Sequence, residues 1–167
     1  MKAFFASTVF LLFIFQAGSV FAGGIIIGNN SSIKMNAQTI KMNCQDMTIK
    51  SGGQLDLDSG LIDHARHFTL DKGSTLLDDT GEIILCGTWK NNSDFQQGSG
   101  SMITFAEGCN VPNRVLGFGD TDGDGIPDIR ETIRDSNNDG LPDFLDNAIA
   151  DVNWAPPTSV YLMLLLD

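Results

Sequence analysis

The chain has 167 residues, a formal net charge of −11 and 42% hydrophobic residues. Such an acidic chain is a poor partner for nucleic acid, because proteins that bind the phosphate backbone present positive charge to it. The charge favours cations as ligands instead, and ten of the 21 acidic residues lie between positions 120 and 151. The length suits one compact domain with a small additional module.

The first 22 residues are typical of a secretory signal peptide. Lys2 provides a positive charge, positions 9–15 are apolar, and Val20-Phe21-Ala22 offers a cleavage site after Ala22. A membrane-spanning helix needs ~20 apolar residues, which is more than this run contains. We therefore expect residues 1–22 to be removed and the protein to be exported, to the cell surface, the extracellular medium or a periplasm.

The region that follows, residues 23–109, is predicted to be all-β. Short segments alternate apolar and polar residues, which is the period of a half-buried strand. These segments are 33–35, 40–42, 47–49 and 55–57, and turns rich in glycine, asparagine and aspartate separate them. No stretch of this region has the periodicity of an amphipathic helix.

The same region repeats itself every 21 or 22 residues. MTIKSGGQL at 47–55 aligns with FTLDKGSTL at 68–76, and at an offset of 22 Ile27 and Ile33 fall on Ile49 and Leu55. A repeat of this length predicts a solenoid, in which apolar positions stack from coil to coil. The predicted fold is a short right-handed β-solenoid, similar to a β-helix, of three or four coils; a β-sandwich is the alternative. Residues 24–108 weakly resemble the short β-helix segments of bacterial surface proteins and adhesins.

The C-terminal part is predicted to have little regular structure. Trp89, Phe95 and residues 102–105 are expected to close the end of the solenoid, and residues 110–119 to form a linker. A module at 120–146 and a tail at 147–167 follow. The apolar stretch 160–166 is too short to span a membrane, so a final strand or a buried tail is the preferred interpretation.

Residues 120–146 contain two copies of one acidic pattern, fifteen residues apart: DTDGDGIPDIRE and DSNNDGLPDFLD. Calcium prefers six to eight oxygen ligands, and carboxylates at positions 1, 3 and 5 of a tightly curled loop converge on one point. A glycine at position 6 permits the turn, and an acid at position 12 closes the far side. The candidate calcium ligands from this spacing are Asp120, Asp122, Asp124, Glu131, Asp135, Asn137, Asp139 and Asp146. A solvated acidic segment without bound metal is the alternative.

The stretches DTDGDGIPD and DSNNDGLPD resemble the thrombospondin type 3 repeat of secreted and surface proteins. The resemblance covers about 27 of the 167 residues. It implies calcium ligation that includes Asp128 and Asp143 in addition to the acids and the amide at positions 1, 3 and 5. The chain departs from the family in having only two copies and no cysteines between them. A dockerin-like pair of loops is the nearest competitor, but its longer helix does not fit between Glu131 and Arg134.

Three cysteines, Cys44, Cys86 and Cys109, leave one thiol over if a disulfide forms in an oxidising compartment. The sequence does not choose among the three pairings. His64 and His67 lie close to Asp63 and are either a transition-metal site or residues of a solvent-facing corner.

The sequence contains no motif of a known catalytic site, neither a nucleophile elbow nor a zinc-protease helix nor a phosphate loop. We therefore expect a non-enzymatic, calcium-binding structural or adhesion protein. Its expected partners are calcium ions and a surface glycan or protein, with no nucleic acid. The alternative is a carbohydrate-binding or polysaccharide-processing module, which would need exposed aromatic residues in line, such as Trp89, Phe95 and Trp154.

Overall fold

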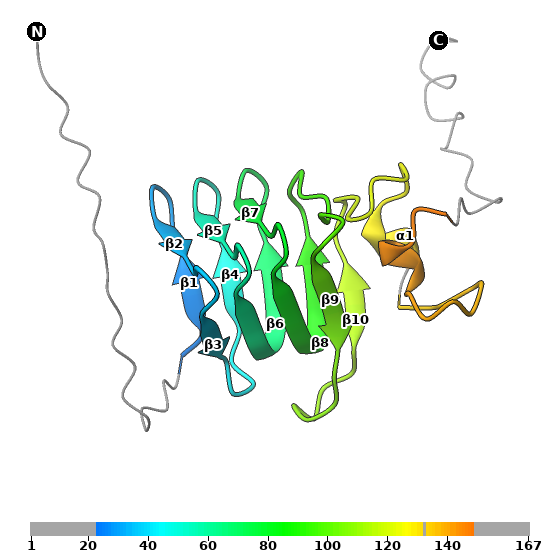
Figure 1. Cartoon of the computed structure of the whole chain (residues 1–167), viewed down its shortest axis with the longest axis horizontal. Coiled ribbons are helices and arrows are strands. Elements are labelled where there is room, and N and C mark those ends of the chain that lie inside the picture. Colours follow the sequence, from blue (N-terminus) through cyan, green and yellow to red (C-terminus); the bar gives the residue numbers. More distant parts are fainter. Residues whose placement is uncertain (1–22, 132, 149–167) are drawn as a thin grey trace, which may run out of the picture.

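The computed structural model describes residues 23–131 and 133–148, so the predicted signal peptide and most of the predicted tail lie outside the described residues. Short strands dominate it, and two helical turns follow them (Figure 1). The elements are β1 (Ile25–Ile27), β2 (Ser32–Lys34), β3 (Thr39–Lys41), β4 (Met47–Ile49), β5 (Gln54–Asp56), β6 (Leu61–Leu70), β7 (Thr75–Leu77), β8 (Glu82–Asn91), β9 (Met102–Phe105), β10 (Arg114–Leu116), the helix α1 (Asp128–Glu131) and the 3₁₀ turn η1 (Asp143–Leu145).

The strands pair in parallel and stack in three columns, which makes the chain a β-solenoid of about four turns (Figure 1). One column contains β1, β4, the second half of β6, the second half of β8 and β10. The next contains β2, β5 and β7, and the third contains β3, the first halves of β6 and β8, and β9. The prediction of a solenoid is confirmed. The alternative β-sandwich is wrong, because that fold is built from antiparallel strands.

The register of the strands reproduces the sequence repeat. Ile33 pairs with Leu55, 22 residues later, and Met47 pairs with Phe68, 21 residues later. Apolar residues at equivalent positions therefore lie above one another and form ladders through the core. Each coil contacts only its neighbours, as in other solenoids. The indole of Trp89 continues the second ladder and stacks on the ring of Phe68, with the ring centroids 5.3 Å apart.

The backbone conformation explains why asparagine occurs in the turns at the corners of the solenoid. Asn36 and Asn43 have φ values of 47° and 48°, in the left-handed region that asparagine tolerates better than other side chains apart from glycine. In β6 the corner is made inside the strand, where His64 has a φ of 55° and the register with β8 shifts. The long strands β6 and β8 therefore each serve two faces of the solenoid.

The predicted linker, residues 110–119, contains the last strand of the solenoid. β10 pairs in parallel with β8, and Val115 is buried beside Trp89. A three-residue strand with one inward-facing valine is too short for its alternation to be recognised in sequence. The solenoid therefore extends to β10, and the acidic loops follow it directly. Among the described residues, no helix has the length and apolar character needed to cross a membrane.

Candidate metal centre

The two acidic loops lie against the C-terminal end of the solenoid (Figure 1). α1 is held to the segment after β10 by two backbone hydrogen bonds. The amide of Asp128 donates to the carbonyl of Gly119 at 2.9 Å, and the amide of Ile129 donates to the carbonyl of Gly117 at 3.2 Å. These bonds fix the end of the first loop to the body of the protein.

The first loop curls around the carboxylate of Asp120. This carboxylate accepts hydrogen bonds from the amides of Gly123, at 2.8 Å, and Gly125, at 2.9 Å. Both glycines have positive φ values, 80° and 96°, which residues with a side chain adopt only at a cost in energy. The glycine at position 6, Gly125, therefore permits the turn that the sequence predicts.

The curl brings three carboxylates together. Oxygens of Asp120, Asp122 and Asp124 lie within 4.8 Å of one another. Partial burial, together with the charges of Asp124 and Asp120, raises the pKa of Asp122 to about 6. Burial and the charge of Asp120 also raise the pKa of Asp124. Like charges at this separation disfavour one another's ionisation, so the cluster is unstable as a set of bare anions.

Glu131, at position 12 of the first copy, is the most perturbed acid of the loop. The single turn of α1 places it where its side chain is 8% exposed, and neither carboxylate oxygen has a hydrogen-bond partner in the structure. One oxygen of Asp122 and one of Asp124 are likewise buried without a partner. Burial, followed by the charges of Asp122 and Asp124, raises the pKa of Glu131 to about 9.

Such groups are rare in native proteins, because a buried polar atom without a partner loses its hydration and gains nothing in return. The first loop therefore presents four carboxylates at positions 1, 3, 5 and 12, and several of their oxygens have no hydrogen-bond partner among the described residues. All the donors are oxygens, which suit a hard cation such as calcium and not a soft metal. The residues present fit a calcium ion.

The second loop has the same plan with one neutral residue. The carboxylate of Asp135 accepts a hydrogen bond from the amide of Gly140 at 3.0 Å, as that of Asp120 does from Gly125. The side-chain amide of Asn137 donates to Asp139 at 3.2 Å and to Asp146 at 2.9 Å. Asn137 thus connects positions 3, 5 and 12, and one oxygen of Asp135 is buried without a hydrogen-bond partner among the described residues. The second loop is the more exposed of the two.

The carboxylates of Asp128 and Asp143, which the family resemblance assigns to calcium, accept hydrogen bonds within the protein. The carboxylate of Asp128 accepts hydrogen bonds from the amide and hydroxyl of Thr121, at 2.8 and 2.7 Å, and from the indole of Trp89, at 3.1 Å. The carboxylate of Asp143 accepts from the amide and hydroxyl of Ser136, both at 2.7 Å. In each copy, the carboxylate at position 9 therefore holds the residue at position 2 through two hydrogen bonds. Neither Asp128 nor Glu131 belongs to the group of Asp120, Asp122 and Asp124, whose carboxylate oxygens lie within 4.8 Å of one another.

Several residues that position the loops were not predicted. The side-chain amide of Asn91 donates to the hydroxyl of Thr121 at 3.1 Å and to the carbonyl of Phe95 at 3.2 Å. The buried ring of Phe144 meets that of Phe105 edge to face, with centroids 6.0 Å apart. Comparison of the two copies offers a signal for one pair, because Thr121 and Ser136 occupy the same position. The others have no signal in the sequence.

Two other predicted groups do not form a site among the described residues. His64 pairs with its neighbour Asp63, and Nδ1 of His67 accepts a hydrogen bond from the amide of Thr88 at 3.2 Å. Neither histidine joins a group of three potential metal ligands in the described part of the chain. Trp89 and Phe95 are buried in the core, so they form no exposed row of aromatic side chains. Trp154 lies outside the described residues.

The raised pKa values predict an unusual dependence of stability on pH. Without calcium, folded Asp122, Asp128 and Glu131 have pKa values of about 6, about 7 and about 9, mainly through burial. Their protons are bound more tightly in the folded than in the unfolded state. Their contribution to stability is therefore complete below about pH 4 and is lost as the pH rises toward about 9. Calcium competes with the protons of Asp122 and Glu131, so its stabilising effect should grow over the same range.

Urea unfolding at a series of pH values, with chelator and with millimolar calcium, measures both effects. Acids away from the loops titrate equally in the two series, so the difference between the curves reports the loops alone. A difference that shrinks as the pH rises from about 5 to about 9 would contradict the prediction.

Comparison with known proteins identifies no relative of this chain. No protein-family model matches the sequence, and neither a curated protein nor a solved structure matches it. The resemblance to the thrombospondin type 3 repeat stays a prediction.

Proposed function

We propose that this protein is an exported, non-enzymatic, calcium-binding structural or adhesion protein. The observation that carries the proposal is Glu131, whose two carboxylate oxygens are buried without a hydrogen-bond partner among the described residues, in a loop with Asp122 and Asp124. A buried, uncompensated carboxylate is costly, and a bound cation is one of the few groups that offset the cost for several acids at once. Calcium fits because all the ligands are oxygens and because the spacing is that of a twelve-residue calcium loop.

Two sets of residues would hold the ions. The first set is Asp120, Asp122, Asp124 and Glu131, and the second is Asp135, Asn137, Asp139 and Asp146. When bound, calcium supplies positive charge that offsets the repulsion among the acids. Asp128 and Asp143 would act beside these sets, because their hydrogen bonds to Thr121 and Ser136 hold each loop closed.

The loops would also cap the solenoid. A solenoid needs terminal caps, because its last coil otherwise exposes apolar side chains and unpaired strand edges. Here the hydrogen bond between Trp89 and Asp128 and the burial of Phe144 hold the loop module on the last coils. Ions that bind only the folded loops would stabilise the solenoid by mass action. Extracellular calcium modules bind at ~10⁻⁴–10⁻³ M, so the sites would be filled permanently in a calcium-rich medium.

Export and adhesion are proposed from the sequence and the shape together. Residues 1–22 have the pattern of a signal peptide, and the acidic composition disfavours nucleic acid as a partner. The solenoid has extended side faces, and repeat proteins use extended surfaces of this kind to bind partners. The proposed partner is a glycan or protein at a cell surface.

Calorimetric titration with calcium is expected to show two ions, bound with unequal affinity. The first loop has four carboxylates at positions 1, 3, 5 and 12, whereas the second has three and an amide, and calcium affinity rises with ligand charge and rigidity. Asp124→Ala should therefore remove the tighter site, and Asp139→Ala the weaker one. Both variants should keep the circular dichroism of the solenoid. Absence of binding at millimolar calcium would refute the proposed function.

A further inference from the structure

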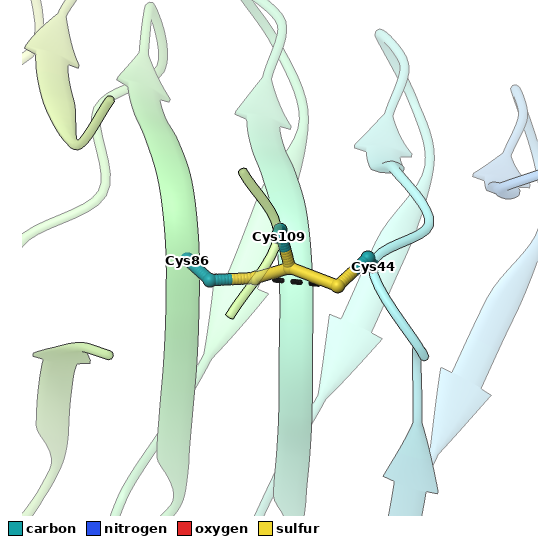
Figure 2. Close-up of side chains that lie close together, drawn as sticks. All are labelled: Cys44, Cys86 and Cys109. Carbon is teal, nitrogen blue, oxygen red and sulfur yellow. Dashed lines mark hydrogen bonds between the residues drawn. A yellow bond between two sulfur atoms is a disulfide. The ribbon is translucent and has the colours of Figure 1, made fainter. Parts of the chain in front are cut away.

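The three cysteines, which are far apart in the sequence, meet at one point on the solenoid (Figure 2). Cys44 precedes β4, Cys86 lies in β8, and Cys109 lies in the loop after β9. β6 runs between β4 and β8, and Cys109 lies over β6, between the other two cysteines (Figure 2). The Cα atom of Cys109 is 5.4 Å from that of Cys44 and 5.5 Å from that of Cys86, and both distances are normal for a disulfide.

Cys109 is within bonding reach of both partners, yet a cysteine sulfur forms one disulfide at a time. The two bonds, Cys44–Cys109 and Cys86–Cys109, are therefore alternatives. Each alternative leaves one thiol next to the disulfide, since the sulfurs of Cys44 and Cys86 are 3.9 Å apart. A thiolate beside a disulfide is the arrangement that thiol–disulfide exchange requires.

The order of the three sulfurs favours exchange over metal binding. Figure 2 shows the sulfur of Cys109 between those of Cys44 and Cys86. In exchange, the attacking thiolate approaches the central sulfur from the side opposite to the leaving sulfur. Three thiolates that hold a metal instead surround the ion, and none of them lies between the other two.

We propose that the disulfide of Cys109 migrates between Cys86 and Cys44 and thereby exposes or conceals a reactive thiol. The thiolate of Cys86 attacks the sulfur of Cys109, a Cys86–Cys109 bond forms, the Cys44–Cys109 bond breaks, and Cys44 leaves as a thiolate. The step consumes no oxidant or reductant. Its reverse restores the first pairing.

The two pairings differ in which thiol solvent can reach. Cys86 is 1% exposed, and its sulfur lies 3.5 Å from the carbonyl oxygen of Ala65, so as a free thiol it has an acceptor and is shielded. Cys44 is partly exposed, in the turn between β3 and β4. The Cys44–Cys109 pairing is therefore the concealed form, and the Cys86–Cys109 pairing is the reactive form.

The reactive form would take a disulfide as its substrate. The thiolate of Cys44 attacks an exposed disulfide of a low-molecular-weight thiol, forms a mixed disulfide with one half and releases the other half as a thiolate. The site is thus one of reversible covalent modification. It involves none of the residues of the calcium loops, so it stands independently of the proposed function.

Peptide mapping by mass spectrometry tests the exchange. The purified chain is kept at mildly alkaline pH, where more of the free thiol is ionised, and is then quenched with acid and digested. Both Cys44–Cys109 and Cys86–Cys109 peptides are expected from the wild type. After incubation with oxidised glutathione, the mixed disulfide should appear at Cys44, in molecules that contain the Cys86–Cys109 bond.

Two variants provide matched controls, and each keeps one disulfide to hold the loop. Cys86→Ser locks the Cys44–Cys109 pairing and should lower the rate of glutathionylation at least about tenfold, because no thiol remains to start the exchange. Cys44→Ser locks the other pairing and should be equally inert. Circular dichroism and urea unfolding would show that both variants are folded. The proposal is overturned by a single pairing in the wild type, by modification at Cys86, by Cys86→Ser reacting as fast as the wild type, or by three reduced thiols with a bound metal.

Discussion

Replacing Glu131 by glutamine is expected to raise stability without calcium and to reduce the stabilisation that calcium provides. Without calcium, the free energy of unfolding should rise by about 1–3 kcal/mol at neutral pH, because the buried carboxyl must carry an uncompensated charge or take up a proton, and an amide does neither. With calcium, the first site loses a carboxylate ligand. Its affinity should fall about tenfold or more, so calcium should stabilise the variant less than it stabilises the wild type.

Urea unfolding of Glu131→Gln and of the wild type, in chelator and in millimolar calcium, measures both effects. Glu107→Gln is the matched control, because Glu107 is an exposed glutamate outside the loops. Its effect should stay within about 0.5 kcal/mol under both conditions. If Glu131→Gln destabilises the protein equally under both conditions, the buried carboxylate has another partner and is not a calcium ligand.

The solenoid could be predicted because its stability depends on contacts between equivalent positions in neighbouring coils. Such contacts leave a period in the sequence, and the pairing of Met47 with Phe68 confirms it. The period fails after β8, where Trp89 pairs with Val115, 26 residues later. The extra residues lie between β9 and β10, because β8 and β9 still pair at an offset of 20, as Glu82 does with Met102. The sequence therefore predicts a linker where the structure has the last coil.

The repeat in the sequence accounts for the positions of two of the three cysteines, but not for that of Cys109. Cys44 and Cys86 are 42 residues apart, which is twice the repeat of 21, so the period alone places them at equivalent positions two coils apart. Cys109 is 23 residues from Cys86 and does not follow the period. Its place depends on the path of the loop after β9, which no local pattern specifies.

The loops show the same division between local and long-range information. The spacing of Asp120, Asp122 and Asp124 predicted that they converge, and their oxygens do lie close together, because a curled loop of this length is a local structure. The bond between Asp128 and Trp89 joins residues 39 apart in the sequence. The family resemblance assigned Asp128 to calcium, and only the tertiary structure shows what its carboxylate contacts.

The largest loss of stability is expected from Phe144→Ala. The ring of Phe144 is fully buried against the last coils and meets Phe105 edge to face. Truncating such a residue in a core costs about 3–5 kcal/mol. Ile129 occupies the equivalent position in the first copy, fifteen residues earlier, but is 38% exposed. Ile129→Ala is therefore the matched control and should cost no more than about 0.5 kcal/mol.

Phe144→Ala also tests whether the loops act as a cap. The variant keeps every proposed calcium ligand, so calorimetry should still show two bound ions. If Phe144 transmits the effect of calcium to the solenoid, the increase in unfolding free energy that calcium produces should be smaller in the variant than in the wild type or in Ile129→Ala. An undiminished increase would mean that the first loop, through Asp128 and Trp89, couples calcium to the solenoid alone. Phe144 would then be a core residue with no part in capping.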